Sequence, residues 1–382
     1  MLKKSIVVVL VAILAYLLMW PVPMNPHAWQ PPAFVAAKGQ FQLTDDMAVA
    51  QRLWEGKVPG PEGTAIGPDG MLYTGLENGD IVRMSLVARA GDEADDKGNN
   101  PNIEPEVVGN TGGRALGIQF DAEGNLIITD AHKGLLSMAP DGAMTLLTNS
   151  FGDKPINVAD DLDIASDGKI YFTDVTSTMS MDDLTYMLVE GNADGVLLSY
   201  DPASGDTMLE MDGLRIGNGV ALGPNEEYII VPETVGLQIK RLWLKGPLAG
   251  QVDTFVDNLP GWPDNVTFNG RDTFWVALAY PRHKKLEALS NSPFQKKLMM
   301  RLPKAMAWVP EFHNSVFRDT YGMFVGIDLD GNISHFSDAH SGHIGLLTSV
   351  LEHQGHLYLG SLVSDYIGRM PVPSSKVINH VQ

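Results

Sequence analysis

Short apolar segments, separated by turns rich in glycine and aspartate, recur along most of the chain. One copy reads DLDIA, SDG, KIYFTD and GVLLSYD between residues 161 and 201, so strand-length apolar runs alternate with tight-turn residues. Five other copies, which begin at residues 64, 117, 219, 265 and 349, follow the same order. A fourth strand such as AMTLLTN or VDTFVDN closes most copies. The pattern therefore predicts six repeated units of four strands.

Six four-stranded units predict an all-β fold, a six-bladed β-propeller over residues 45–375. One unit cannot bury its own faces, whereas a closed ring buries all of them. The sixth copy lacks a fourth strand, and the run VAQRLWEG at residues 49–56 could supply it. The N-terminal strand would then close the last blade and protect an open sheet edge. A large β-sandwich is the alternative, but it does not explain the regular recurrence.

Two connections between second and third strands, 176–194 and 280–320, are long. Each joins the second and third strands of a blade, so both inserts are expected on the face where the first strands begin. Loops on a rigid scaffold often carry function. The stretch 282–310 holds seven Lys or Arg residues and one Glu, interleaved with Met, Leu and Trp. It predicts either an amphipathic segment or lid that faces a membrane, or a packed loop with a solvated basic face.

The first 20 residues predict a membrane anchor. Lys3 and Lys4 precede an apolar run that is shorter than the ~20 residues of a usual spanning helix but suits a signal sequence. No small-residue cleavage site follows closely, which favours an uncleaved signal anchor over a cleaved peptide. The two lysines place the N-terminus in the cytoplasm. The bulk would then be extracytoplasmic (periplasmic, extracellular or lumenal), tethered through a proline-rich spacer at 21–44.

Composition excludes several classes of function. The formal net charge of the 382 residues is −19, and an acidic chain repels phosphate backbones, so we expect no nucleic-acid partner. The chain has no cysteine, which excludes disulfides, thiol nucleophiles and zinc–thiolate sites.

Polar residues stand at the heads of five first strands, while the sixth has Leu347-Thr348-Ser349, with neither acid nor amide. In blade order the five are Glu62, Arg114, Asp160, Asn218 and Asp264. Because first strands line a propeller's channel, the acids and the amide should converge near the axis. Three carboxylates repel one another unless a cation neutralises them. Oxygen ligands select a hard cation, and Ca²⁺, with an irregular shell, fits more naturally than Mg²⁺.

The fifth copy carries two polar residues, in GWPDNV. Asp and Asn before a strand often start a turn, because both bond to their own backbone, and for Asn265 that interpretation stays open. The acids at the same position in other blades favour Asp264 as a metal ligand and as the base or nucleophile of a reaction, with Asn265 beside it. A calcium ion with open positions could polarise a carbonyl or phosphoryl oxygen.

Three further side chains are candidates for the site. His132, in TDAHKGL, follows a second strand and could shuttle protons, although a surface histidine is the simpler explanation. His343, in HSGHIG, could line the mouth of the channel near the last blade or lie in a solvated loop. Arg114 could orient an anionic group of a substrate or pair with a neighbouring carboxylate.

The chain resembles the calcium-dependent propeller superfamily of gluconolactonase, regucalcin and paraoxonase. It is most similar to the strictosidine synthase-like branch, which includes adipocyte plasma membrane-associated proteins. The stretches that look alike span most of residues 58–370 and include GPEGTAI, DLDIASDGKIYFTD, NGVAL, LPGWPDN and EHQGHLYLGS. The resemblance implies a membrane anchor and a catalytic calcium held by Glu62, Asp160, Asn218 and Asp264, with Asn265 adjacent.

The resemblance also has departures that bear on function. The family pattern usually has Asn at position 160, and Asp161 corresponds to a ligand of a second, structural calcium. The glutamate that strictosidine synthase uses for condensation falls near Gly345, which cannot act as an acid, so condensation is the less favoured activity. The resemblance implies instead hydrolysis of small-molecule esters or lactones. A non-catalytic binding or scaffold propeller with structural calcium is the alternative.

Overall fold

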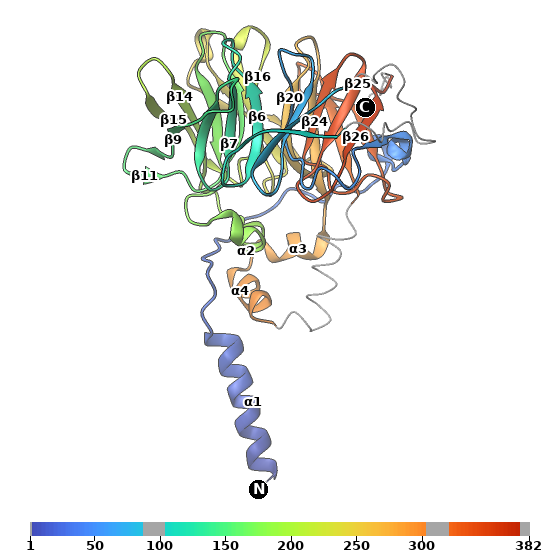
Figure 1. Ribbon diagram of the computed structural model, residues 1–382. Coiled ribbons are helices and arrows are strands. Elements are labelled where there is room, and N and C mark those ends of the chain that lie inside the picture. The colour runs from blue at the N-terminus through green and yellow to red at the C-terminus, as the bar shows by residue number, and fades with distance from the viewer. Residues whose placement is uncertain (1, 87–103, 303–320, 375–382) are drawn as a thin grey trace.

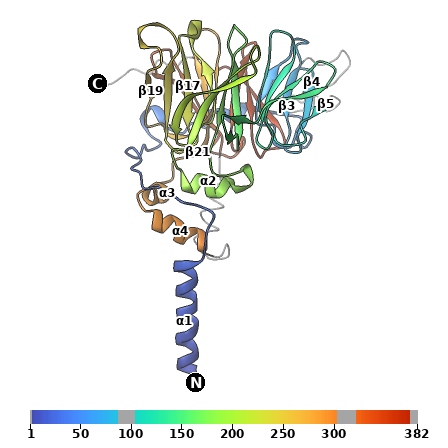
Figure 2. The same ribbon diagram turned by 90° about the vertical axis from the view of Figure 1, so that its left-hand side faces the viewer.

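Six four-stranded antiparallel sheets stand around a common axis in the computed structural model, which describes residues 2–86, 104–302 and 321–374. Figures 1 and 2 show this ring in two views at right angles. In five of the sheets, four strands that follow one another along the chain pair in sequence order. The sheets are the blades of a six-bladed β-propeller, so the fold predicted from the repeats is confirmed.

Within each blade the strands are ordered outward, with the first strand at the central channel. The first blade contains β2 (Thr64–Ile66), β3 (Leu72–Gly75), β4 (Asp80–Met84) and β5 (Glu106–Asn110). The second contains β6 (Ala115–Phe120), β7 (Leu126–Asp130), β8 (Gly134–Met138) and β9 (Met144–Thr148). The third contains β12 (Ala159–Ile164), β13 (Ile170–Asp174), β14 (Gly195–Asp201) and β15 (Asp206–Leu214). A small hairpin, β10 (Ser150–Phe151) and β11 (Lys154–Pro155), lies between the second and third blades in sequence.

The remaining blades follow the same order. The fourth contains β16 (Ala221–Leu222), β17 (Tyr228–Glu233), β18 (Gln238–Trp243) and β19 (Val252–Val256). The fifth contains β20 (Gly261–Phe268), β21 (Phe274–Pro281), β22 (Met323–Ile327) and β23 (Ile333–Asp338). The sixth contains β24 (Ser349–His353), β25 (His356–Gly360), β26 (Ile367–Pro371) and β1 (Gln51–Leu53). Short 3₁₀ turns lie at Gly39–Phe41, Asp46–Val49, Met181–Asp183, Pro224–Glu226 and Gly246–Leu248.

The N-terminal strand closes the ring. β1 pairs antiparallel with β26, with Gln51 opposite Arg369 and Leu53 opposite Ile367. The last blade thus gains its fourth strand from the beginning of the chain, as the sequence predicts. Within the described residues, the closure leaves no blade with an unpaired third strand.

The core lies between the blades, on the second and third strands. Every residue of β7, β13 and β17 is buried. Neighbouring blades cover both faces of such a strand, so its sequence is a run of apolar residues followed by polar ones at its end, as in LIITD and IYFTD, and does not alternate. The outermost strands are more exposed, as in β9, where two of five residues are exposed.

Both long inserts fold into helices on the same side of the propeller (Figures 1 and 2). The first insert contains α2 (Leu184–Glu190), and the second contains α3 (Lys284–Leu289) and α4 (Pro293–Arg301). The rest of the second insert, 303–320, lies outside the described residues, and with it the end of the basic stretch 282–310. The three helices lie between the propeller and the N-terminal helix.

Helix α1 (Leu2–Met19) extends away from the propeller, and most of its large apolar side chains are exposed (Figure 1). Across the described part of the chain, no helix combines the length and apolarity that a membrane crossing requires. The segment after α1 lies against the inserts. The Trp29 N–H donates to the Ser290 carbonyl (3.1 Å), and Arg282 donates to the carbonyls of Pro32 and Ala33 (3.0 Å each).

Candidate functional site

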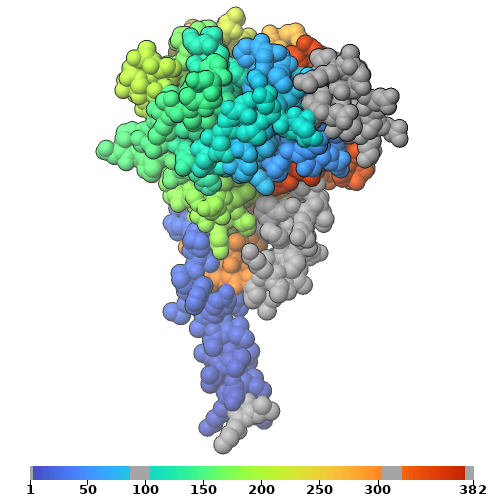
Figure 3. All heavy atoms as spheres, in the orientation of Figure 1, coloured from blue at the N-terminus to red at the C-terminus, as the bar shows by residue number. Residues whose placement is uncertain are grey.

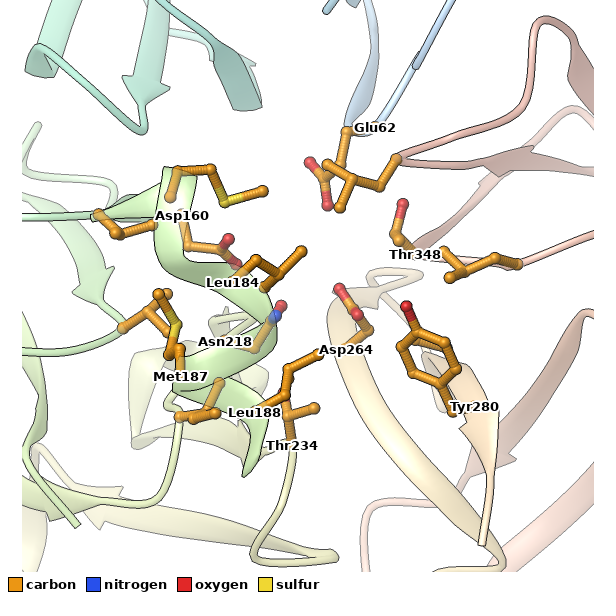
Figure 4. A pocket seen from close by; sticks show the side chains of 17 residues that line it. Glu62, Asp160, Leu184, Met187, Leu188, Asn218, Thr234, Asp264, Tyr280 and Thr348 are labelled. Atoms are coloured by element: carbon orange, nitrogen blue, oxygen red, sulfur yellow. The ribbon is translucent and has the colours of Figure 1, made fainter. Parts of the chain in front are cut away.

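A cavity of about 60 Å³ lies under the inserts, where the first strands converge. Its polar wall consists of Glu62, Asp160, Asn218, Thr234, Asp264, Tyr280 and Thr348. Its apolar wall consists of Val158, Val175, Met181, Leu184, Met187, Leu188, Ile216, Ala279, Leu346 and Leu362. Figure 4 shows the carboxylates of Glu62, Asp160 and Asp264 and the amide of Asn218 turned toward a common centre. The four residues therefore meet at one end of the channel.

β-Bulges orient two of these side chains. The pairing register of β20 with β21 shifts between Pro263 and Val266, which leaves Asp264 and Asn265 outside the regular ladder. A similar shift in β12, between Ala159 and Leu162, surrounds Asp160. Bulges next to active sites commonly redirect side chains in this way. The interpretation of GWPDNV as a turn before a strand is wrong, because β20 already begins at Gly261 and holds the pair in a bulge.

Each bulge sends neighbouring side chains to opposite parts of the channel. Asp160 and Asp264 line the cavity under the inserts. Asp161 and Asn265 line a second, larger space of about 500 Å³ between the first strands. The six predicted metal ligands thus divide into four that share the cavity and two that face the rest of the channel.

A glycine after Asn218 allows the fourth and fifth blades to approach. A β-carbon added at Gly219 would lie 2.5 Å from the Val266 nitrogen and 2.6 Å from the Asn265 α-carbon. Both contacts are to main chain, which cannot move aside without shifting the bulge. Any larger residue would therefore separate Asn218 from Asp264.

Hydroxyl groups of neighbouring strands hold the main chain at these positions. Thr129 Oγ1 donates to the Asp160 carbonyl (2.5 Å), Thr173 Oγ1 to the Asn218 carbonyl (2.5 Å), and Ser349 Oγ to the Glu62 carbonyl (2.5 Å). The strand-head pattern assigned no role to these three hydroxyls. For Thr129 and Thr173 a signal was present, the repeated Thr-Asp at the ends of the second strands in LIITD and YFTD.

Three buried carboxyl or amide oxygens in the cavity have no hydrogen-bond partner among the described residues: Glu62 Oε2, Asp160 Oδ2 and Asn218 Oδ1. The buried hydroxyls of Thr234 and Thr348 have none there either. The other Glu62 oxygen accepts from Asn265 Nδ2 at 2.5 Å. An unpaired buried polar group costs about 1–3 kcal/mol, and more when it is charged. Three such oxygens in one cavity indicate a missing partner, and the partner must be a hydrogen-bond donor or a cation.

Burial raises the pKa values of the cavity carboxyls. It raises the pKa of Glu62 from 4.5 to about 7, although the Arg114 charge and the Asn265 hydrogen bond oppose the shift. It raises the pKa of Asp160 and of Asp264 well above 3.8, and the charge of Glu62 adds to both shifts. The pKa of Asp161 rises for the same two reasons. Negative charge is thus disfavoured here unless a cation compensates it.

The residues present fit a divalent cation. Three carboxylates and the nearby Arg114 guanidinium leave two negative charges uncompensated when all are ionised. The donors are all oxygens, as Ca²⁺ prefers, and three of them are unpaired. The oxygens of the three carboxylates do not all lie within 4.8 Å of one another in the described structure. Because Ca–O distances are about 2.3–2.6 Å, we expect an ion to draw these side chains inward or to bind one of them through water.

A second group of side chains, Asp45, Asp338 and His340, lies close enough together to hold a metal ion. Its contacts have a structural explanation. His340 Nδ1 lies 2.7 Å from Asp338 Oδ1, and this hydrogen bond raises the pKa of His340. The other Asp338 oxygen accepts from the Thr44 N–H at 2.6 Å. These contacts connect the segment before β1 to the end of β23. They already use the carboxylate of Asp338, the most buried of the three residues.

The other predicted site residues do not line the cavity. Arg114 is buried beside Glu62 and donates from Nη2 to the Leu362 carbonyl (3.2 Å), which favours the pairing role over contact with a substrate. His132 is exposed, and its backbone N–H donates to Asp130 Oδ1 (2.9 Å). His343 Nε2 lies 2.7 Å from the Ala50 carbonyl, so the ring contacts the N-terminal segment.

Three hydroxyl residues complete the polar wall. Thr348 occupies the strand-head position of the sixth blade, and its Oγ1 is buried without a partner among the described residues. The Tyr280 phenol has a pKa raised by burial and by the charge of Asp264, so it stays protonated. The blade alignment pointed to Thr348 only as the position without an acid. Tyr280 lies near the end of β21 and Thr234 directly follows β17, both of them second strands, and neither had a distinguishing signal.

Comparison with known sequences identifies relatives over most of the chain. The profile for Strictosidine synthase matches residues 160–247, and that for Strictosidine synthase-like, N-terminal, matches residues 39–84. The adipocyte plasma membrane-associated protein of Salmo salar is 33% identical over 350 residues, which cover 87% of this chain and 80% of that protein. The Homo sapiens protein of the same name is 31% identical over 369 residues, 92% and 84% of the two chains. Strictosidine synthase-like 13 of Arabidopsis thaliana is 32% identical over 322 residues, 79% and 75%.

Solved structures with the same fold have lower identity. A gluconolactonase from Xanthomonas campestris has a TM-score of 0.56 and 17% identity, covering 93% of this chain and 99% of that one. Regucalcin from Agrobacterium tumefaciens, described as a calcium-binding protein, has a TM-score of 0.54 and 13% identity, covering 84% and 92%. At these identities the likeness shows the fold alone.

Proposed function

We propose a function on the premise that this chain belongs to the strictosidine synthase-like family, together with the adipocyte plasma membrane-associated proteins. The chain is a calcium-dependent hydrolase of small esters or lactones, acting in the cavity under the inserts. One observation carries the proposal: unpaired buried oxygens of Glu62, Asp160 and Asn218 surround the same cavity as Asp264. The gluconolactonase and regucalcin folds are consistent with it.

The four strand-head residues would hold the ion, through the oxygens of Glu62, Asp160, Asn218 and Asp264. A bound Ca²⁺ with open positions polarises the carbonyl of an ester or lactone. Asp264 then acts as the base that takes a proton from water, or as the nucleophile at the carbonyl carbon. The Tyr280 hydroxyl, protonated beside Asp264, can donate a hydrogen bond to the leaving oxygen.

The cavity wall favours apolar substrates. Apart from Glu62, Asp160, Asn218 and Asp264, the polar side chains of the cavity are three hydroxyls. Aliphatic and methionine side chains form the rest. No lysine or arginine lines the cavity in the described structure, so an anionic substrate would find only the ion as a partner. A polyhydroxylated lactone would leave most of its hydroxyls unpaired. We expect uncharged esters and lactones with an apolar acyl or aryl part.

The role of Asp264 gives the direct test of the enzyme hypothesis. Asp264→Asn should abolish calcium-dependent hydrolysis of aryl esters and lactones, and EDTA should do the same to the wild type. Asp163→Asn is the matched control, because Asp163 is half-buried and lines the other part of the channel. Hydrolysis that survives both EDTA and Asp264→Asn would refute the mechanism. Calcium binding without hydrolysis of any tested ester or lactone would favour the binding or scaffold protein.

We also propose that α1 attaches the propeller to a membrane, with the propeller on the extracytoplasmic side. The exposed apolar side chains between Ile6 and Trp20 support this, as do the two lysines that precede them. The exposed Lys284, Lys285 and Phe294 of the second insert could contact the same surface. A variant without residues 2–20 should leave the membrane fraction for the supernatant. An unchanged distribution would refute the anchor.

A further inference from the structure

The second insert contributes a buried lysine beneath the first insert. Lys296, in α4, is only 2% exposed. Its Nζ donates to the carbonyl of Glu190, the last residue of α2, at 2.8 Å. Burial, together with the charge of Arg215, lowers the pKa of Lys296 to about 8. A buried lysine is unfavourable unless its hydrogen bonds are made, which points to a specific structural task.

The segment after α1 holds the same end of α2. The Asn25 N–H donates to Glu190 Oε1. Asn192, two residues past the helix, accepts from the His27 N–H (2.9 Å) and donates to the Asn25 carbonyl (3.1 Å). The end of α2 is therefore bound by α4 on one side and by residues 25–27 on the other.

The same helix forms part of the cavity wall. Leu184, Met187 and Leu188 of α2 line the cavity (Figure 4). Met187 and Leu188 also belong to one apolar cluster with Met24 of the N-terminal segment and Met299 of α4. Figure 3 shows α4 next to the N-terminal segment, directly below α2. A displacement of α2 would therefore change the cavity itself.

We propose that Lys296 and the segment 24–27 are positioning elements that hold α2 over the cavity, so the chain between α1 and the propeller forms part of the substrate site. This inference rests on the proposed function only where it predicts an effect on catalysis. The positioning of α2 does not depend on that function. Lys296 touches neither the cavity nor the strand-head residues, and acts through Glu190. The N-terminal segment is then more than a spacer, because its contacts determine where the apolar side chains of α2 lie.

Hydrogen exchange of α2 in the full-length protein tests the proposal without reference to activity. Lys296→Met removes the donor but keeps an apolar side chain of similar length. We expect exchange of the α2 amides to become about tenfold faster or more, because a hydrogen bond from a charged group is lost. Gln295→Met is the matched control on the same helix, since the Gln295 side chain is exposed. It should exchange like the wild type.

A second pair of variants tests the contact from the other side. Glu190→Gln keeps an oxygen that can accept from the Asn25 N–H, whereas Glu190→Ala does not. Only Glu190→Ala should accelerate exchange in α2. This pair keeps the proposal open to refutation if Lys296→Met fails to fold.

Kinetics separate this proposal from the proposed function. Lys296→Met and Glu190→Ala should raise KM for an apolar ester about threefold or more and change kcat little, because α2 contacts the non-reacting part of the substrate. Calcium affinity should not change. If the wild type hydrolyses no ester, the proposed function fails but the exchange result still stands. Equal α2 exchange in wild type, Lys296→Met and Glu190→Ala, or equal acceleration in Gln295→Met, would overturn the proposal.

Discussion

Replacing Glu62 with glutamine should change stability in opposite directions with and without calcium. Burial raises the pKa of the Glu62 carboxyl from 4.5 to about 7 in the folded state without an ion. Each pKa unit corresponds to about 1.4 kcal/mol, so an ionised Glu62 destabilises the ion-free protein by about 3 kcal/mol. Because the pKa is raised in the folded state, the stability of the ion-free protein with a protonated Glu62 is fully present below about pH 4.5. It is lost as the pH rises through about 7.

Glutamine removes that charge and keeps the oxygen that accepts from Asn265 Nδ2. In EDTA at about pH 8, we therefore expect Glu62→Gln to be more stable than the wild type by up to about 3 kcal/mol. At about pH 5 the difference should be much smaller. With free calcium at about 1,000 times the wild-type Kd the order reverses, because binding then adds about 4.1 kcal/mol to the wild type, while the variant lacks one ligand and gains less.

Urea unfolding of the full-length protein in detergent measures both effects. The wild type and Glu62→Gln are compared at the two pH values, each with EDTA and with excess calcium. Three findings would refute the reasoning: equal stability of the ion-free wild type at both pH values, no gain in Glu62→Gln at the higher pH, or equal stabilisation of both proteins by calcium.

Three further predictions follow from the geometry of the site. His132→Ala should keep at least about half of the wild-type kcat/KM for an aryl ester, because His132 is exposed and outside the cavity; a loss of about a hundredfold would restore it as a catalytic residue. Gly219→Ala should lower the free energy of unfolding by about 1–3 kcal/mol and weaken calcium binding, measured by urea unfolding and calorimetry, because the new methyl group meets the main chain of β20; unchanged values would contradict the close approach. Met187→Ala should raise kcat/KM for esters with a bulkier acyl group relative to acetate, because Met187 limits the cavity; an unchanged ratio would show that this wall does not select substrates.

The fold was predictable because the repeat is regular. Each blade presents the same order of apolar runs and turns, and the missing last strand could be matched to residues 49–56, which include β1. Alignment of the strand heads also brought Glu62, Asp160, Asn218 and Asp264 to one place, since all first strands of a propeller share an axis.

Other features depend on contacts that a repeat does not encode. A bulge looks like a turn in sequence, so the turn interpretation stayed open for Asn265, and the divergence of Asp264 from Asn265 could not be foreseen. The positions of His132 after a strand and of His343 in a loop did not determine which way their rings point. The contacts of Lys296 with α2 join two inserts that follow no repeat, and their packing sets the cavity wall.

The central claim is that Glu62, Asp160, Asn218 and Asp264 hold a divalent cation. A crystal structure of the full-length protein with excess calcium, with anomalous scattering used to locate the ion, tests it most directly. The account predicts one strong peak in the cavity under α2, about 2.3–2.6 Å from oxygens of most of these residues. The claim would be contradicted by a structure at saturating calcium with no ion in this cavity and the carboxylates in their present positions.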